Sequence, residues 1–142
     1  MHRLALVSLL LVAAGVAQGS PPSKRFFFAP QCGSASQALT ANSSTTIQSP
    51  NYPSNYPNNY CYEWNFSCPN QMTLSCPDIQ ILSLFFCLDD VLEVSGNGER
   101  KYLCGNTALN YVVPANGMLF ARFRTDWLLT AKGFQCTVSC AA

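Results

Sequence analysis

The chain has 142 residues, a formal net charge of +1 and only 11% charged residues. This length suits one domain of ordinary size. The flat charge balance excludes the concentrated basic surface of nucleic-acid binders, so no nucleic-acid partner is expected.

The first 19 residues are typical of a secretory signal peptide. Arg3 precedes an apolar run over residues 4–17, and small residues at Ala17 and Gly19 suit a cleavage site. The run is shorter than the roughly 20 residues that a transmembrane helix needs, and no later stretch is longer. We therefore expect residues 1–19 to be removed, no membrane span, and a protein secreted outside the cell.

Loss of the signal peptide also removes His2, the only histidine. A mature chain without imidazole excludes a Ser-His-Asp triad, a Cys-His dyad and histidine-ligated zinc. Asp89 and Asp90 are neighbours, so on a strand they would point to opposite faces. A carboxylate pair would need Asp126 or Glu93 to come near. We expect no enzymatic activity.

Residues 20–31 are expected to form a short N-terminal tail. Lys24-Arg25 fits either a dibasic processing site or an ordinary charged pair. The three phenylalanines at 26–28 are too apolar for a free tail, so we expect them to lie on the domain or on a partner.

From Cys32 onward the sequence indicates short strands and turns. The Tyr-Pro steps at 52–53 and 56–57 favour an extended loop. Apolar and polar residues then alternate with period two, as in strands with one buried face. The expected strands lie within 61–68, 72–81, 91–94, 102–104, 119–124 and 134–140. Many short strands without a helical period predict an all-β sandwich or barrel.

All eight cysteines follow the expected tail, at positions 32, 61, 68, 76, 87, 104, 136 and 140. An even number behind a signal peptide predicts four disulfides. A metal site is the alternative, but the chain has no Cys-x-x-Cys motif and no mature histidine.

These residues resemble a CUB domain. The motifs that carry the resemblance occur in the same order as in the family. They are Ser49-Pro50-Asn51-Tyr52-Pro53, Asn55-Tyr56-Pro57, Cys61-x-x-Trp64, Cys87-x-x-Asp90, Cys104-Gly105, Phe123-x-x-Asp126 and Gly133-Phe134. The resemblance implies a jelly-roll-like β-sandwich of two mainly antiparallel five-stranded sheets, with the domain at residues 32–142. It also implies the disulfides Cys32–Cys61 and Cys87–Cys104.

The four remaining cysteines can be paired by register. If the last strand runs antiparallel to the strand of Cys76, with Cys136 opposite Cys76, then Cys140 falls opposite residue 72 and near Cys68. This predicts Cys76–Cys136 and Cys68–Cys140, and the swapped pairing is the alternative. Such extra cysteines are similar to those in the CUB modules of some arthropod secreted proteases.

The resemblance also implies a calcium site, the one cofactor considered. Asp90 and Asp126 match two of the family's acidic ligands, and Gln80 stands where the third, a glutamate, is usual. Apolar residues follow Asp126 where calcium-binding relatives carry Asn or Ser. Because charge tunes calcium affinity, both departures argue against a tight site. The alternative is that Asp90 and Asp126 only cap turns.

Two sequons predict glycosylation at Asn42 and Asn65. Trp127, Leu128 and Leu129 should lie in a loop, either as a partner surface or folded back into the core. Arg122 and Arg124 share one strand face, where they either contact an acidic partner or keep that face of the sheet solvated.

The function expected from this resemblance is non-catalytic binding of an extracellular protein or glycan, as in the similar single-domain spermadhesins. An alternative is a regulatory CUB piece of, or derived from, a larger secreted serine protease. A venom or reproductive-fluid component and a protease inhibitor are further alternatives, the inhibitor ranking last because no cysteine-framed inhibitory loop stands out. The sequence leaves the ligand and the oligomeric state open.

Overall fold

The computed structural model describes residues 31–142. The expected signal peptide, the tail up to residue 30 and Lys24-Arg25 lie outside the described residues. Within 31–142 the chain forms nine strands and no helix: β1 (Gly33–Ala38), β2 (Ser44–Gln48), β3 (Cys61–Ser67), β4 (Met72–Ile81), β5 (Val91–Ser95), β6 (Arg100–Leu103), β7 (Gly105–Val113), β8 (Met118–Arg124) and β9 (Gly133–Cys140). This part of the chain therefore contains no helix able to cross a membrane.

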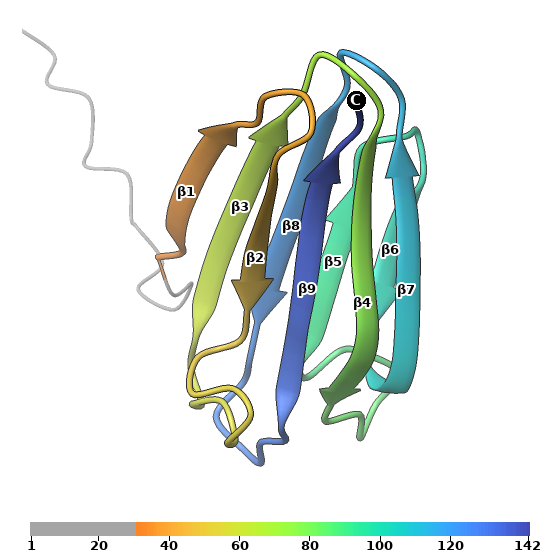
Figure 1. Ribbon diagram of the computed structural model, residues 1–142. Coiled ribbons are helices and arrows are strands. Elements are labelled where there is room, and N and C mark those ends of the chain that lie inside the picture. The colour runs from red at the N-terminus through yellow and green to blue at the C-terminus, as the bar shows by residue number, and fades with distance from the viewer. Residues whose placement is uncertain (1–30) are drawn as a thin grey trace, which may run out of the picture.

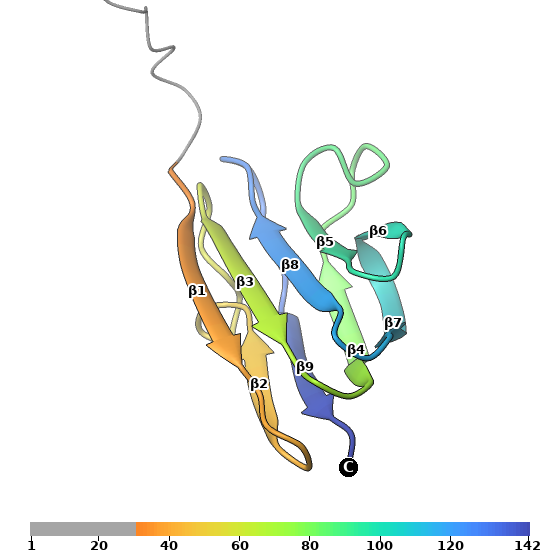
Figure 2. The ribbon, with the colours of Figure 1, turned by 90° about the horizontal axis from the view of Figure 1, so that it is seen from above.

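The strands form two layers, which Figures 1 and 2 show from two directions. The first sheet has the order β1-β3-β8-β5-β6 and the second β2-β9-β4-β7. Every pair is antiparallel except β1 with β3. The predicted mainly antiparallel sandwich is confirmed.

One detail of that prediction needs correction, because the second sheet has four described strands instead of five. Successive strands alternate between the sheets except at β5 and β6, which pair as a hairpin within the first sheet. The glycine-containing turn after Ser95 closes this hairpin. The chain then crosses to the second sheet at Gly105, whose φ of 72° suits a residue without a side chain.

Period-two alternation builds the core between the sheets. On β8, the inward side chains of Leu119, Ala121 and Phe123 are completely buried, as the alternation predicts. On β4 the inward positions shift from Cys76 to Ile79, because the pairing register changes between them. This bulge accommodates a proline within the strand.

Four disulfides join the described cysteines: Cys32–Cys61, Cys68–Cys140, Cys76–Cys136 and Cys87–Cys104. They are the four pairs expected from the sequence. Met72 of β4 pairs with Cys140 of β9, which is the register used to argue the two extra links. The link between Cys68 and Cys140 therefore lies beside the turn that precedes β4.

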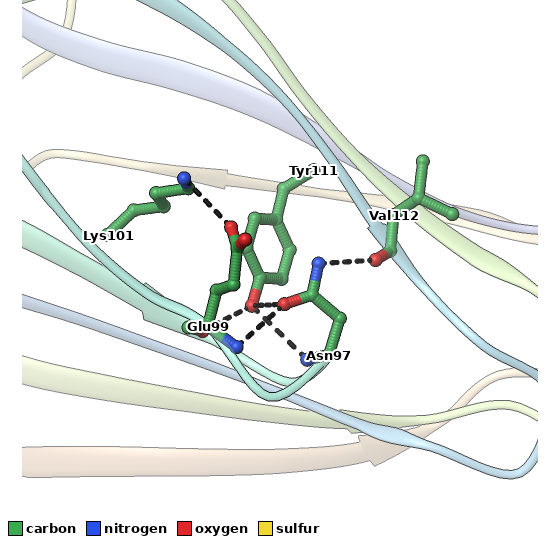
Figure 3. A network of polar contacts seen from close by, with 5 residues as sticks. All are labelled: Asn97, Glu99, Lys101, Tyr111 and Val112. Atoms are coloured by element: carbon green, nitrogen blue, oxygen red, sulfur yellow. Dashed lines mark hydrogen bonds and ion pairs between the residues drawn. The ribbon is translucent and has the colours of Figure 1, made fainter.

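A polar network ties the two sheets together at the end where β7 finishes (Figure 3). The buried Tyr111 hydroxyl lies 2.6 Å from both Asn97 Oδ1 and the carbonyl oxygen of Glu99. The Asn97 amide also donates to the Val112 carbonyl at 3.1 Å, and Glu99 forms an ion pair with Lys101. These bonds fix the β5–β6 turn against β7, so this end of the sandwich is closed by polar contacts.

Candidate functional site

Three loops meet at the opposite end of the sandwich, the lower end in Figure 1. They connect β2 to β3 (residues 49–60), β4 to β5 (82–90) and β8 to β9 (125–132). We call these residues the loop end. It contains most of the residues that the sequence singles out.

Tyr56 anchors the first loop in the core. Its side chain is 1% exposed and packs edge-on against Phe123, with ring centroids 5.0 Å apart. Its hydroxyl donates to Asp90 Oδ2 at 2.7 Å and accepts from the Leu82 amide at 2.9 Å. Burial raises the pKa of the Tyr56 hydroxyl, so it stays protonated. Tyr56 is thus a structural link between the first loop and the core.

Asp90 joins all three loops. Its carboxylate is fully buried, and Oδ1 accepts from the Asp126 amide at 2.8 Å while Oδ2 accepts from Tyr56. Burial raises the pKa of Asp90, against the lowering effect of these two hydrogen bonds. Both oxygens therefore hold the loops in fixed positions.

The third loop is held by its backbone and turns its apolar side chains outward. Asp126 Oδ1 accepts from the Leu128 amide at 2.8 Å, and Asn58 donates to the carbonyls of Trp127 and Leu128. The side chains of Trp127, Leu128 and Leu129 are 71%, 37% and 61% exposed. Of the two alternatives left by the sequence, the structure therefore shows an exposed surface rather than core.

The second loop adds a surface that the sequence analysis missed. The Asp89 carboxylate accepts from the amides of Leu84 and Phe85, and the disulfide at Cys87 ties the loop to the segment between β6 and β7. Phe86 is 96% exposed. The only signal was the apolar run before Cys87, which fits no alternating strand.

Together these two loops expose seven large apolar side chains: Leu84, Phe85, Phe86, Leu88, Trp127, Leu128 and Leu129. We call these seven residues the apolar loops. The first sheet and the hydrogen bonds of Asp89, Asp90 and Asn58 hold their backbones. The loop end therefore presents a preformed apolar surface.

Gln80 does not join the two aspartates with which the sequence grouped it. Its amide nitrogen donates to both carboxylate oxygens of Asp78, at 3.1 Å each. Lys132 also binds Asp78, at 2.6 Å, and lies over the ring of Tyr52. The Lys132 ammonium, with help from Gln80, lowers the pKa of Asp78. The structure thus brings Asp90 and Asp126 together and directs Gln80 to another carboxylate.

The two arginines of β8 differ. Arg122 lies between the carboxylates of Glu93 and Glu63, with Glu93 also bound by Arg100. Arg124, two residues further along the same face, forms no ion pair or side-chain hydrogen bond within residues 31–142. Only Arg124 is therefore available to an acidic partner.

The two sequons lie on strand and turn positions away from the apolar loops. Asn42 is exposed in the turn between β1 and β2. Asn65 is half-buried on β3, opposite Phe120 of β8 and facing away from the core. Glycosylation at both asparagines stays a prediction.

A family model described as the CUB domain matches residues 32–138. The chain belongs to the CUB domain family. Human cubilin is 28% identical over 109 residues, which cover 71% of this chain and 3% of cubilin. Human Tolloid-like protein 1 is 33% identical over 100 residues, covering 66% of this chain and 10% of that protein. The CUB domain thus corresponds to a small part of these relatives.

Solved structures share the fold. The extracellular region of zebrafish Gpr126/Adgrg6 superimposes with a TM-score of 0.66 at 22% identity, covering 77% of this chain and 15% of that one. The MASP-1 CUB2 domain bound to Ca2+ gives 0.61 at 19% identity, covering 75% of this chain and 100% of that domain. CUB domains are extracellular protein-interaction modules of proteases and receptors, and they are generally non-catalytic.

CUB domains often bind calcium, an ion that prefers six to eight oxygen ligands. Here both Asp90 oxygens accept protein hydrogen bonds, and one Asp126 oxygen caps the Leu128 amide. Gln80 is engaged with Asp78. Among residues 31–142, no three acidic, histidine or cysteine side chains are grouped to hold a metal. The residues present therefore do not fit the calcium site that the resemblance implies.

Proposed function

We propose that this CUB domain is a secreted, non-catalytic binding module that recognises an extracellular protein with its apolar loops. The observation that carries the proposal is the gathering of seven exposed large apolar side chains at one end of the sandwich. Large apolar side chains exposed together on a folded domain mark an interaction site. Exposed aromatic side chains such as Phe86 and Trp127 also supply much of the energy of known interfaces.

The fixed backbone of these loops supports the same conclusion. Asp89, Asp90 and Asn58 hold the loop backbones by hydrogen bonds, and a disulfide anchors Cys87. A preorganised surface loses little conformational entropy when a partner binds, so more of the contact energy appears as affinity. Apart from the indole N–H of Trp127, these apolar side chains offer no hydrogen-bonding groups to sugar hydroxyls, which favours a protein over a glycan.

The resemblance associates calcium with acidic side chains that hold a partner's lysine. In this chain Gln80 is bound to Asp78, and Asp90 is buried with each oxygen accepting a hydrogen bond from the protein. We therefore expect recognition that depends on apolar contact and not on calcium.

The test is capture from the extracellular fluid of the source by immobilised wild-type protein, with and without a chelator. We expect a defined partner, identified by mass spectrometry, that stays bound in chelator and is lost with Phe86→Ser or Trp127→Ser. Met118→Ser is the matched control, because Met118 is 63% exposed but lies at the other end of β8. Retention by both loop variants, or loss with the control, would contradict the proposal.

A second candidate is a regulatory domain that acts within a larger protease. The curated relatives support it, because each contains the matching region as a small part of a much longer protein. The mass of the secreted species separates the two functions. A species no heavier than the 15.5 kDa chain, apart from glycan, supports an independent binding protein, and a much heavier one supports the regulatory role.

A further inference from the structure

A pocket lies on the outer face of the first sheet, under the loop 82–90. Its volume is about 400 Å³, and it is lined by Phe86, Cys87, Leu88, Tyr102 and Arg124. Arg124 comes from the end of β8 and Tyr102 from β6, while the disulfide at Cys87 holds the loop above them. The pocket thus combines apolar and aromatic walls with one guanidinium group.

The guanidinium of Arg124 differs from every other basic group in the described part of the chain. The remaining four basic side chains in residues 31–142 each bind a carboxylate: Arg100 and Arg122 bind Glu93, Lys101 binds Glu99, and Lys132 binds Asp78. Arg124 has no such partner in this range and is half-buried. Its charge is therefore uncompensated beside an apolar wall.

The neighbouring carboxylates are already engaged. Glu93 is buried and shared between Arg100 and Arg122, and Glu63 faces Arg122 at 3.8 Å. On this sheet face three arginines thus meet two glutamates. Both glutamates are bound by Arg100 or Arg122, which leaves the Arg124 guanidinium at the pocket without a carboxylate partner within residues 31–142.

We propose that this pocket binds a partner's carboxylate that stands next to a large apolar side chain, as in a Phe-Glu or Leu-Asp step. This inference rests on the proposed function and names the chemistry of its partner. Guanidinium groups pair with carboxylates through two parallel hydrogen bonds, which suits the planar Arg124. The adjacent apolar side chain would pack between Phe86, Leu88 and the ring of Tyr102.

Two short peptides test the pocket directly. Acetyl-Gly-Phe-Glu-Gly-amide and its Gln counterpart differ only in the carboxylate, and each is titrated into ¹⁵N-labelled secreted protein. We expect the acidic peptide to bind about tenfold more tightly, the effect of one charge-assisted pair in a partly buried site. The amide shifts should centre on residues 86–88, 102 and 124, and added salt should reduce the preference. Equal binding, or shifts centred elsewhere, would overturn the inference.

Arg124→Gln should abolish the preference for the acidic peptide while leaving thermal unfolding unchanged, because Arg124 has no partner within residues 31–142 to lose. Lys101→Gln removes one exposed charge that does not line the pocket, and it should keep the preference. Capture of the natural partner separates this inference from the proposed function. If Phe86→Ser abolishes capture and Arg124→Gln leaves it intact, the apolar loops bind a partner but the pocket chemistry is wrong. If capture survives Phe86→Ser, Trp127→Ser and Arg124→Gln alike, both ideas fail.

Discussion

The hydroxyl of Tyr56 donates a 2.7 Å hydrogen bond to Asp90, 34 residues further along the chain. Both side chains are buried, and Asp90 also accepts from the Asp126 amide. One tyrosine and one carboxylate therefore hold all three loops of the loop end. The apolar loops keep their positions because this buried pair fixes their backbones from beneath the surface that we propose to bind a partner.

Removing the Tyr56 hydroxyl should destabilise the domain without disturbing its aromatic packing. Tyr56→Phe leaves Asp90 Oδ2 and the Leu82 amide without their shared partner. A buried polar group that loses its hydrogen bond costs about 1–3 kcal/mol, and we expect a loss of unfolding free energy in that range. Urea denaturation measures it, with the exposed Tyr102→Phe as control. Equal stability of the two variants would contradict the role of the pair.

The buried Asp90 should make stability depend on pH. Burial raises its pKa in the folded state above the value of about 3.9 in the unfolded chain. The folded protein then binds the proton more tightly, so this group costs stability as pH rises between the unfolded and the folded pKa. In the Asp90→Asn variant the side chain at this position does not titrate. The unfolding free energy of the variant minus that of the wild type should therefore rise as pH increases from the unfolded to the folded pKa of Asp90, and then level off.

Denaturation of both proteins at a series of pH values provides the measurement. Other titrating groups are common to the two proteins and largely cancel in the difference. A difference that falls as pH rises would mean that the hydrogen bonds to Asp90 outweigh its burial.

Calcium should not stabilise the protein. Each Asp90 oxygen already accepts a protein hydrogen bond, Gln80 is bound to Asp78, and no third acidic side chain in residues 31–142 joins Asp90 and Asp126, so the ligand number that calcium needs is not assembled. We expect the same melting temperature in calcium and in chelator. Heat of binding in titration calorimetry, or a melting temperature raised by calcium in the wild type but not in Asp90→Ala, would show the opposite.

Much of the fold could be predicted from the sequence because its strands follow simple rules. Leu119, Ala121 and Phe123 alternate with polar neighbours, and burial on one side of a sheet enforces that period. The same period predicts that Cys140 lies opposite residue 72, as observed. Covalent links can therefore be argued from register where strand pairing is strict.

The remaining features depend on contacts that a linear pattern does not carry. β1 reads Gly-Ser-Ala-Ser-Gln-Ala and is exposed along its length, so no alternation marks it. The amide of Gln80 donates to Asp78, and Lys132, 54 residues further along the chain, binds the same carboxylate. Phe86 is exposed because a disulfide and Asp89 shape its loop, and no periodic rule describes such a loop.

Opening the Cys87–Cys104 disulfide should affect binding more than its stability cost suggests. The link closes 17 residues, and loop-closure entropy gives about 3 kcal/mol, against about 4 kcal/mol for the 72 residues closed by Cys68–Cys140. The paired change to serine at 87 and 104 releases the loop that presents Phe86. We expect it to lose partner capture while folded.

The paired serine change at 68 and 140 is the comparison, because it costs more stability but lies away from the apolar loops. At a temperature where both variants are folded by circular dichroism, it should retain capture. Loss of capture in both variants, or in neither, would show that partner capture does not depend specifically on the Cys87–Cys104 disulfide.

Gly133, at the end of the loop after β8, packs closely against Ser49 because it has no side chain. Its φ is 86°, and an added Cβ would lie 1.8 Å from Ser49 Oγ. Ser49 is buried, and its Oγ accepts from the Phe134 amide at 3.0 Å, so it cannot move aside without losing that bond. Gly133→Ala should therefore lower the unfolding free energy by more than about 3 kcal/mol, because it combines backbone strain with a steric clash.

Gly98→Ala is the control that measures the backbone strain alone, because Gly98 has a φ of 91° but nothing within 4 Å of the added atom. Chemical denaturation should show the Gly133 variant as clearly less stable than the Gly98 variant, and equal losses would remove the clash with Ser49 as the cause.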